Sequence, residues 1–304
     1  MYCLLLPPMH FHYTSFETLK SIVRKPSSDK GLCFWASRFD CFGDKDEYKL
    51  GISTIKRLLP LLEMRLQPDR RIAPAFEWEE IYKNETLPFP YIVSFTDRND
   101  NNYMWENYAC KGKGVAIELD DTQRIVNKYT KHLVVKKCIY LGENTDEELY
   151  KEIENEYINS AFAALSSQHK NIAFALLSKY PQLFVALIGR YLLSYVAPRI
   201  KGRPYHMEEE TRAILAAPRR EVEKYFKDIE GIIKAFPDDM RSYKHFMKSE
   251  KTRTRPNGET VYYQEIFLPA NILKKVYVKD ATLVKQAEEV LEDKGFRGVN
   301  VVCL

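Results

Sequence analysis

Alternating hydrophobic and polar positions predict short β-strands along much of the chain. Residues 9–13 alternate hydrophobic side chains with His10 and His12, which is typical of a strand with one buried face. Further strands are predicted at 31–37, 91–96, 114–119 and 132–141. Residues 252–268 predict a β-hairpin, because the Asn-Gly pair at 257–258 supplies the residues that a tight turn needs. The chain ends in a predicted helix, a glycine break and a terminal strand.

Helices are predicted where hydrophobic residues recur every three to four positions. The stretch T-S-F-E, from Thr14 to Glu17, has the form of a capping box and predicts that a helix starts at Thr14. A longer helix is predicted at about 48–66. Strands and helices are mixed without a regular strand–helix–strand alternation. The pattern therefore favours one α+β domain over residues 1–304, with a mixed, largely antiparallel sheet and helical insertions at about 146–200 and 219–250.

Composition narrows the class of protein only slightly. The 304 residues include 46 basic and 42 acidic side chains, and a net charge of +4 is too small to indicate nucleic-acid binding. The six cysteines are scattered without the spacing of a zinc site or a disulfide framework, which favours reduced thiols. The most hydrophobic stretch is too short to cross a bilayer and carries Arg190. With no signal peptide evident, we expect a cytoplasmic protein without membrane contact.

The first candidate site is His12-Tyr13-Thr14, at the junction of the predicted strand and helix. The free N–H groups of a helix N-terminus attract anions, and a histidine at the strand end could hold a phosphate or a ribose hydroxyl there. The alternative is that His12 is half-buried in the core and that Thr14 only caps the helix. The motif taken alone favours this alternative. His10 and His12 could also bind a metal as an H-x-H pair, but no third ligand has suitable spacing, so no metal site is predicted.

The second candidate is the motif Glu208-x-Glu210-x-Arg212. In a strand these three side chains share one face, and an arginine beside two carboxylates keeps one of them ionised and fixes its direction. Such a carboxylate can stabilise an oxocarbenium ion or act as a general base. A solvated charged edge is the alternative, but the hydrophobic residues at 213–215 indicate that the acidic face enters a buried strand.

Aromatic and hydroxyl side chains near residue 100 give a third candidate. Trp105 and Tyr108 lie three positions apart, on one face of a helical turn, and could stack on a planar ring or fill the core. Ser94 and Thr96 share one face of the strand before them. The chain lacks the motifs of P-loop proteins, Rossmann dehydrogenases, α/β-hydrolases and zincins, so those classes lose their usual support.

Four motifs follow one another along the chain: H-Y-T at 12–14, M-W-x-x-Y-A at 104–109, G-V-x-I-E at 114–118 and E-x-E-x-R at 208–212. Together they resemble a bacterial and phage-borne family of domains of unknown function that is often encoded near abortive-infection genes. The likeness runs nearly from end to end. This chain departs from the family in its acidic loop, where G-D-K-D-E at 43–47 replaces the usual N-D-P-x-E.

The opening H-Y-T also resembles that of ADP-ribosyltransferase-like proteins, which use NAD. This resemblance implies an ADP-ribosyltransferase-like core in which His12 orients a ribose and an aromatic side chain, Trp105 or Tyr108, stacks on nicotinamide. It implies that Glu210 is the catalytic carboxylate, Glu208 the glutamate on the acceptor side and Arg212 their orienting partner. The residues then expected to bind NAD are His12, Tyr13, Thr14, Ser37, Ser94, Thr96, Trp105, Tyr108 and Arg212.

Three functions compete on this basis. The first is an NAD-dependent ADP-ribosyltransferase-like enzyme that acts as a phage-defence toxin, either by modifying a protein or a nucleic acid or by hydrolysing NAD as a glycohydrolase. The second is a binding protein of the same fold that recognises a nucleotide, nucleic acid or phage component without chemistry. The third is a metal-dependent nuclease that uses the carboxylates of Asp44, Glu47, Glu208 and Glu210. The first requires His12, an aromatic side chain and Glu210 to meet in one cleft.

Overall fold

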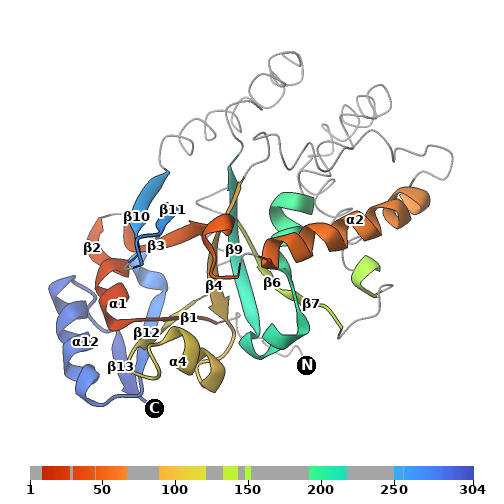
Figure 1. Ribbon diagram of the computed structural model, residues 1–304. Helices are drawn as coiled ribbons and strands as arrows, with labels where there is room; N and C mark the ends of the chain where they lie inside the picture. The colour runs from red at the N-terminus through yellow and green to blue at the C-terminus, as the bar shows by residue number, and fades with distance from the viewer. Residues whose placement is uncertain are drawn as a thin grey trace, which may run out of the picture.

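The structure is a computed structural model (Figure 1). It describes residues 9–27, 30–44, 46–66, 89–120, 133–142, 148–151, 192–217, 250–255 and 257–304. Of the helical insertion predicted at 219–250, only residue 250 is among these residues. Of the insertion predicted at 146–200, residues 152–191 lie outside the described residues. The described part of the 146–200 insertion includes a short π-helical segment, Leu192–Val196 (η3).

An 11-stranded mixed sheet forms the centre of the described structure. Its strands are β1 His10–Thr14, β2 Val23–Ser27, β3 Lys30–Arg38, β4 Phe89–Thr96, β5 Val115–Leu119, β6 Leu133–Lys137, β9 Glu210–Ala217, β10 Lys251–Thr254, β11 Thr260–Leu268, β12 Leu273–Val278 and β13 Asn300–Cys303. The order along the main path is β10-β11-β3-β4-β1-β5-β12-β13, while β2 pairs with β3 and β9 pairs with both β4 and β6. Only β12 and β13 pair in parallel in this sheet. The predicted α+β class with a largely antiparallel sheet is confirmed.

The helices pack on both faces of the sheet. These are α1 Phe16–Ile22, α4 Asn102–Tyr108 and α12 Thr282–Asp293, whereas α2 Glu47–Leu66 packs beside the sheet. The largest hydrophobic core joins α1 and α12 to one face, while α4 packs against the other face of β1 through Trp105 and Met104. The alternation predicted for residues 9–13 is confirmed, because Phe11 and Tyr13 pack under α4 whereas His12 contacts Phe34 on the opposite face.

The pairing of β4 creates a split in the sheet. One edge of β4 pairs with β9 along all 8 residues. The other edge pairs with β3 only at Tyr91 and Ile92, and with β1 only at Thr96. The strands β1 and β3 therefore separate along the middle of β4. Among the described residues, this edge of β4 has no strand partner at 93–95.

A second, smaller hydrophobic cluster packs beside the sheet. Here the buried face of α2, which includes Ile55 and Leu58, contacts the η3 segment and Ile200. Ile200–Lys201 (β8) pairs in parallel with Ile139–Tyr140 (β7) in a separate two-stranded sheet. The predicted strand 132–141 is therefore two strands, because the chain leaves the main sheet at Cys138, whose N–H donates to the Glu210 carbonyl.

The predicted helix start at Thr14 is wrong by one residue. Thr14 is the last residue of β1 and lies opposite Val115, so the sheet holds its backbone in an extended conformation. The helix cap is Ser15, whose hydroxyl oxygen accepts a hydrogen bond of 3.1 Å from the N–H of Thr18. The helix α1 then extends for 7 residues.

A strained loop connects α4 to β5. Cys110, Lys111 and Gly112 all have positive φ, at 51°, 57° and 80°, and non-glycine residues rarely adopt this conformation. Hydrogen bonds to α4 hold the loop, among them Gly114 N–H to the Ala109 carbonyl at 2.8 Å. A Cβ at Gly114 would overlap the Thr14 carbonyl oxygen and lie 2.9 Å from the Ala109 backbone. The glycine therefore lets α4 approach β1 closely.

We expect Gly114→Ala to lower the free energy of unfolding by about 1–3 kcal/mol, because the added methyl group meets backbone atoms that cannot rotate away. The measurement is urea unfolding followed by circular dichroism. Gly43→Ala is the matched control, since a Cβ there has nothing within 4 Å, and it should unfold like the parent protein. Equal stability of the two variants would contradict the close approach of α4 and β1.

Candidate functional site

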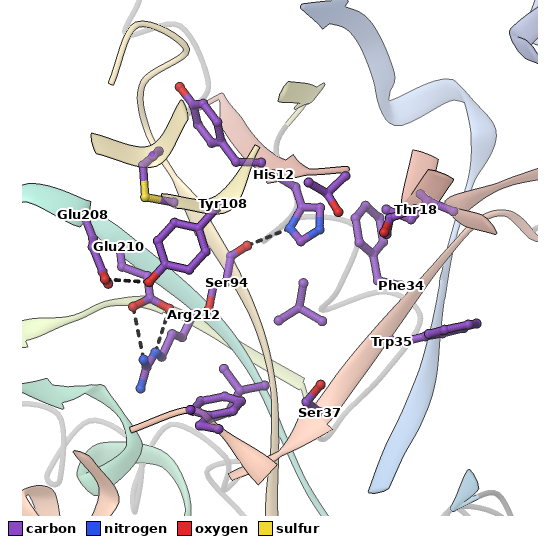
Figure 2. A pocket seen from close by; sticks show the side chains of 18 of the residues that line it. His12, Thr18, Phe34, Trp35, Ser37, Ser94, Tyr108, Glu208, Glu210 and Arg212 are labelled. Carbon is purple, nitrogen blue, oxygen red and sulfur yellow. Dashed lines mark hydrogen bonds and ion pairs between the residues drawn. The ribbon is translucent and has the colours of Figure 1, made fainter. Parts of the chain in front are cut away.

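A cleft of about 760 Å³ opens where β1 and β3 separate (Figure 2). Residues 12–14 of β1 and the adjoining face of α1 line one side, residues 33–37 of β3 line another, and residues 92–94 of β4 lie between them. The remaining lining comes from α4, from the acidic loop before α2, from the segment 201–212 and from β10. A cavity of this volume suits a small-molecule ligand, and its many polar and charged lining residues favour a polar one.

His12 lines the cleft in a defined tautomer. Its Nδ1 lies 2.9 Å from the carbonyl oxygen of Ser94, and because a carbonyl can only accept, Nδ1 must donate. Burial lowers the pKa of His12, although the bond to Ser94 opposes the shift. The imidazole is therefore neutral at physiological pH, and its Nε2 is a hydrogen-bond acceptor. Phe34 and Phe95 fix the ring, with centroids 5.2 and 5.7 Å away.

The two glutamates of the E-x-E-x-R motif reach the cleft by a turn rather than by strand alternation. Arg203–Glu208 (η5) forms a 3₁₀ helix, and β9 begins only at Glu210. Between them Glu209 has φ 46° and ψ 46°, a left-handed conformation that is unusual for glutamate. This turn directs Glu209 toward Arg98 at the surface and brings Glu208 and Glu210 to one cation.

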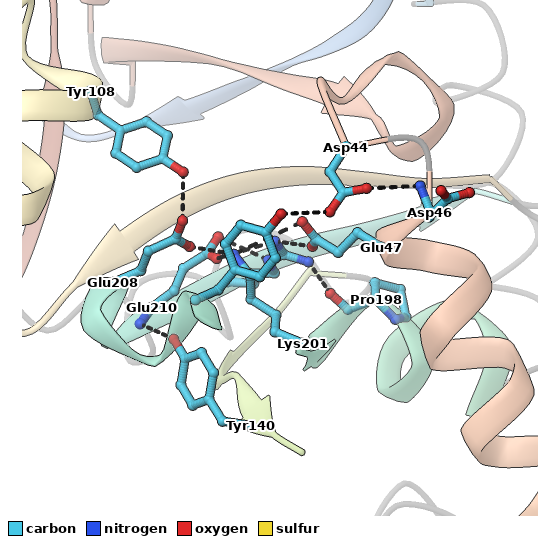
Figure 3. Close-up of polar contacts among 11 residues, drawn as sticks. Asp44, Asp46, Glu47, Tyr108, Tyr140, Pro198, Lys201, Glu208 and Glu210 are labelled. Atoms are coloured by element: carbon cyan, nitrogen blue, oxygen red, sulfur yellow. Dashed lines mark hydrogen bonds and ion pairs between the residues drawn. The ribbon is translucent and has the colours of Figure 1, made fainter. Parts of the chain in front are cut away.

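That cation is Lys201, on β8 (Figure 3). Its Nζ lies 2.7 Å from Glu210 Oε2 and also donates to Glu208 Oε2. Arg212 binds Glu210 through Nε, 2.8 Å from Glu210 Oε1, and through Nη2, 3.1 Å from Glu210 Oε2. All four side chains are 3% exposed. Buried carboxylates of this kind persist only when cations and hydrogen bonds compensate their lost hydration.

The acidic loop and α2 complete the cluster (Figure 3). Glu47, the first residue of α2, forms an ion pair with Arg212, and its other oxygen lies 3.9 Å from Lys201 Nζ. Asp44 accepts a hydrogen bond of 2.9 Å from the Tyr205 hydroxyl and another from the N–H of Asp46. These contacts attach the loop at 43–47 to the segment that carries Lys201.

The two glutamates differ in acidity. Burial opposes ionisation of Glu210, but Arg212 and Lys201 outweigh it and hold its pKa well below the usual range. Burial raises the pKa of Glu208, and Glu210 adds to this shift against the attraction of Lys201. Burial opposes protonation of Lys201, yet its carboxylate partners raise its pKa. Glu210 is thus a permanent anion, and Glu208 is the more basic of the pair.

Tyr108 joins the glutamates to the other side of the cleft. Its hydroxyl donates a hydrogen bond of 2.7 Å to Glu208 Oε1, and burial and the negative charge of Glu208 raise the pKa of this hydroxyl. The side chain is otherwise 47% exposed, which leaves ring surface available to a ligand. Figure 2 shows Tyr108, His12 and the glutamates grouped around the same cleft.

Most of the residues predicted from sequence line this cleft: His12, Tyr13, Thr14, Ser37, Ser94, Tyr108, Glu208, Glu210 and Arg212. Two predicted residues do not. Trp105 is 1% exposed and packs edge-on against Tyr13, so it belongs to the core under α4. Thr96 is fully buried, with its backbone in β4 between β1 and β9. Two further lining residues were not predicted from the sequence: Lys201, which no motif marks, and Arg253 of β10, which lies in an ordinary strand pattern.

Ammonium and guanidinium groups occupy the place that a metal would take in the nuclease hypothesis. Within the described residues, no group of three or more His, Cys, Asp or Glu side chains could hold a metal ion. Glu47, Glu208 and Glu210 converge, but on Lys201 and Arg212. The described cysteines are free, and none of them belongs to such a group.

Comparison with known proteins identifies one related family. Residues 104–213 match the family described as Protein of unknown function (DUF2971). This stretch includes Tyr108 and the whole E-x-E-x-R motif, whereas His12 lies outside it. The resemblance to a domain-of-unknown-function family is therefore confirmed for this stretch, and its links to phages, abortive infection and ADP-ribosyltransferases stay predictions. Searches of curated proteins and of solved structures found no match. Among the described residues, no helix is long and apolar enough to cross a membrane.

We expect Glu210→Gln to lower the free energy of unfolding at pH 7 by about 3–5 kcal/mol, because Lys201 and Arg212 lose their shared anion. The folded pKa of Glu210 lies below its unfolded value, so the stabilisation is present above about pH 4.3 and is lost as the pH falls below it. The difference in free energy of unfolding between Glu210→Gln and the parent protein, measured by urea unfolding, should therefore be smaller at pH 3–4 than at pH 7.

The control is Glu289→Gln, which removes a glutamate whose side chain is 65% exposed and lies 3.9 Å from Lys285. Such a surface pair contributes about 0.5 kcal/mol or less. A cost for Glu210→Gln that is small at pH 7, or that does not change with pH, would contradict the buried charge network.

Proposed function

We propose that the protein is an NAD-dependent ADP-ribosyltransferase-like enzyme whose cleft binds NAD. The observation that supports this most strongly is the convergence of His12, Tyr108 and Glu208 on one cleft from three separate parts of the chain. The hypothesis required His12, an aromatic side chain and Glu210 to meet in one cleft, and Glu210 lines this cleft together with Glu208. The resemblance to abortive-infection proteins further suggests a role as a phage-defence effector.

The roles of the two glutamates follow from their contacts. Both oxygens of Glu210 bind cations. Among the described residues, Glu208 binds one cation, Lys201, and its other oxygen accepts only from the neutral Tyr108 hydroxyl. In this proposal Glu210 therefore positions Lys201 and Arg212 rather than contacting substrate. Glu208, which the resemblance to ADP-ribosyltransferase-like proteins assigns to the acceptor side, is in this proposal the carboxylate that acts at the reacting ribose. Its raised pKa makes it the better proton acceptor of the pair.

The proposed reaction breaks the bond between nicotinamide nitrogen and the ribose C1′ carbon. The bonding electrons leave with nicotinamide, and C1′ gains positive charge as in an oxocarbenium ion. An acceptor hydroxyl or water then forms the new bond to C1′, and its proton passes to Glu208 and on to solvent. The cluster joins three carboxylates to two cations, Glu47, Glu208 and Glu210 against Lys201 and Arg212. The excess of negative charge favours that cationic state.

Tyr108 and His12 position the substrate in this scheme. The exposed part of the Tyr108 ring stacks on the nicotinamide ring, while its hydroxyl keeps Glu208 in place. The free Nε2 of His12 accepts a hydrogen bond from a ribose hydroxyl. The neutral tautomer fixed by Ser94 is the form that this contact needs.

A binding protein without catalysis is the second candidate. The observation that favours it is the complete pairing of Glu210, since an anion held by two cations exerts less field on a ligand. In that case the cleft would hold a nucleotide without cleaving it. Turnover measurements separate the two candidates.

We expect purified protein to release nicotinamide from NAD, and Glu208→Gln to reduce the rate by about 10²–10⁴-fold while NAD still binds, because the change removes a base but keeps the side-chain shape. Glu209→Gln is the matched control, since this neighbouring side chain faces Arg98 at the surface, and it should retain full activity. Chromatography of released nicotinamide and calorimetry of NAD binding measure both quantities. Binding of NAD without release by the parent protein would instead support the non-catalytic role.

We expect His12→Asn to weaken NAD binding about tenfold, the cost of roughly one hydrogen bond. The asparagine amide can still donate to the Ser94 carbonyl from the position of Nδ1, but nothing replaces the Nε2 acceptor. His12→Gln, whose amide oxygen can reach that position, should bind more tightly than His12→Asn. Unchanged NAD affinity in both variants, with a lowered melting temperature, would assign His12 to the core instead.

A further inference from the structure

One cation in the cleft, Arg253, has no anionic partner among the described residues. The other charged side chains that line the cleft all have partners among the described residues. Glu17 pairs with Lys20, Asp44 accepts from Tyr205, Arg255 pairs with Glu259, and the charged groups around Lys201 pair with one another. Arg253 lines the same cleft from β10, and no hydrogen bond or ion pair joins it to a described residue. An unpaired guanidinium in a ligand-sized cleft is a candidate for anion binding.

Aromatic packing holds the Arg253 side chain without using its donors. Its guanidinium carbon lies 5.2 Å from the centroid of the Trp35 ring, and Trp35 packs in turn on Tyr263, with centroids 4.9 Å apart. A guanidinium that stacks on an indole keeps its N–H groups free at its edge. The fork of donors is therefore positioned in advance for a planar or tetrahedral oxyanion.

The surroundings of Arg253 make this part of the cleft electropositive. Burial and the neighbouring charge of Arg255 both lower the pKa of Arg253, so an added anion would relieve repulsion between the two guanidinium groups. Arg255 also lines the cleft, although its own donors are used by Glu259 and by the Cys41 carbonyl. Hydroxyl groups of Thr18 and Ser21 on α1 belong to the same lining.

The cleft is therefore polarised. The acidic cluster lies at β9, and three strands of the sheet, β4, β3 and β11, separate it from β10. A ligand with a cationic ring at one part and an anionic group at another matches this distribution of charge. In a dinucleotide such as NAD, the nicotinamide ring and the pyrophosphate have these properties.

We propose that Arg253, supported by Trp35, forms a subsite for the phosphate groups of a nucleoside diphosphate ligand. This inference builds on the proposed function, in that it assigns the pyrophosphate of NAD to the β10 side of the cleft. It differs from the proposed function in what it requires, since it concerns binding of the phosphates and not cleavage of the glycosidic bond.

The test is isothermal titration calorimetry with ADP-ribose, inorganic pyrophosphate and nicotinamide riboside, which lacks a phosphate. Arg253→Gln should weaken ADP-ribose and pyrophosphate binding about tenfold or more, reduce the salt dependence of binding, and leave nicotinamide riboside unaffected. Lys251→Gln is the control for loss of charge, because Lys251 lies two positions away on β10, is paired with Glu265 and does not line the cleft. It should bind all three ligands like the parent protein.

Two results would overturn the subsite: failure of the parent protein to bind either phosphate ligand, or equal affinity of the parent and Arg253→Gln for ADP-ribose. The outcomes also separate this inference from the proposed function. ADP-ribose binding that depends on Arg253, without nicotinamide release from NAD, supports the subsite and contradicts the enzyme. Nicotinamide release with an unchanged KM in Arg253→Gln supports the enzyme and contradicts the subsite.

Discussion

The candidate site depends on the ion pairs that the buried ammonium group of Lys201 forms with Glu208 and Glu210. Glu208 and Glu210 are each about 3% exposed, and two carboxylates this close repel each other unless a cation lies between them. Lys201 supplies that cation from β8, whose position depends on its pairing with β7 and on the packing of α2 against Ile200. The smaller hydrophobic cluster therefore determines where the glutamates lie. A change in the packing of α2 would therefore move Lys201 and the two glutamates, although Glu47 is the only described residue of α2 that lines the cleft.

The split in the sheet is the second constraint, and it places His12. Because β1 and β3 each pair with only one end of the same edge of β4, the carbonyl of Ser94 is left for a side chain to bind. His12 satisfies this carbonyl and gains a fixed tautomer in return. A continuous sheet would have used Ser94 in its ladder and closed the cleft. The same irregularity in strand pairing thus creates the cavity and orients one of its polar groups.

Sequence patterns predicted the parts of this structure that depend on local residue types. The strands at 91–96 and 114–119 were predicted correctly, although they are buried at nearly every position and not at alternate ones. The Asn-Gly hairpin was also predicted correctly, because Gly258 adopts the positive φ that the turn needs. The shared strand face of Glu210 and Arg212 was predicted correctly from alternation, since both lie in β9. Glu208 lies in η5 instead, and the left-handed residue Glu209 brings it to the same cation. Lys201 could not be predicted, because its role comes from a short parallel pairing between distant segments. Trp105 was ambiguous for a related reason: its spacing from Tyr108 suits a core position and a ligand platform equally.

The two charged parts of the cleft differ in how strongly solvent weakens them. The cluster around Lys201 is buried, so its electrostatic interactions are strong and change little with ionic strength. Arg253 lies on β10, whose residues are exposed, so that dissolved salt screens its attraction for an anion. Affinity for a phosphorylated ligand would then depend on ionic strength, while the acidity of Glu208 and Glu210 would not. A cleft built in this way can adjust how tightly it holds a ligand without altering the chemistry available at its buried part.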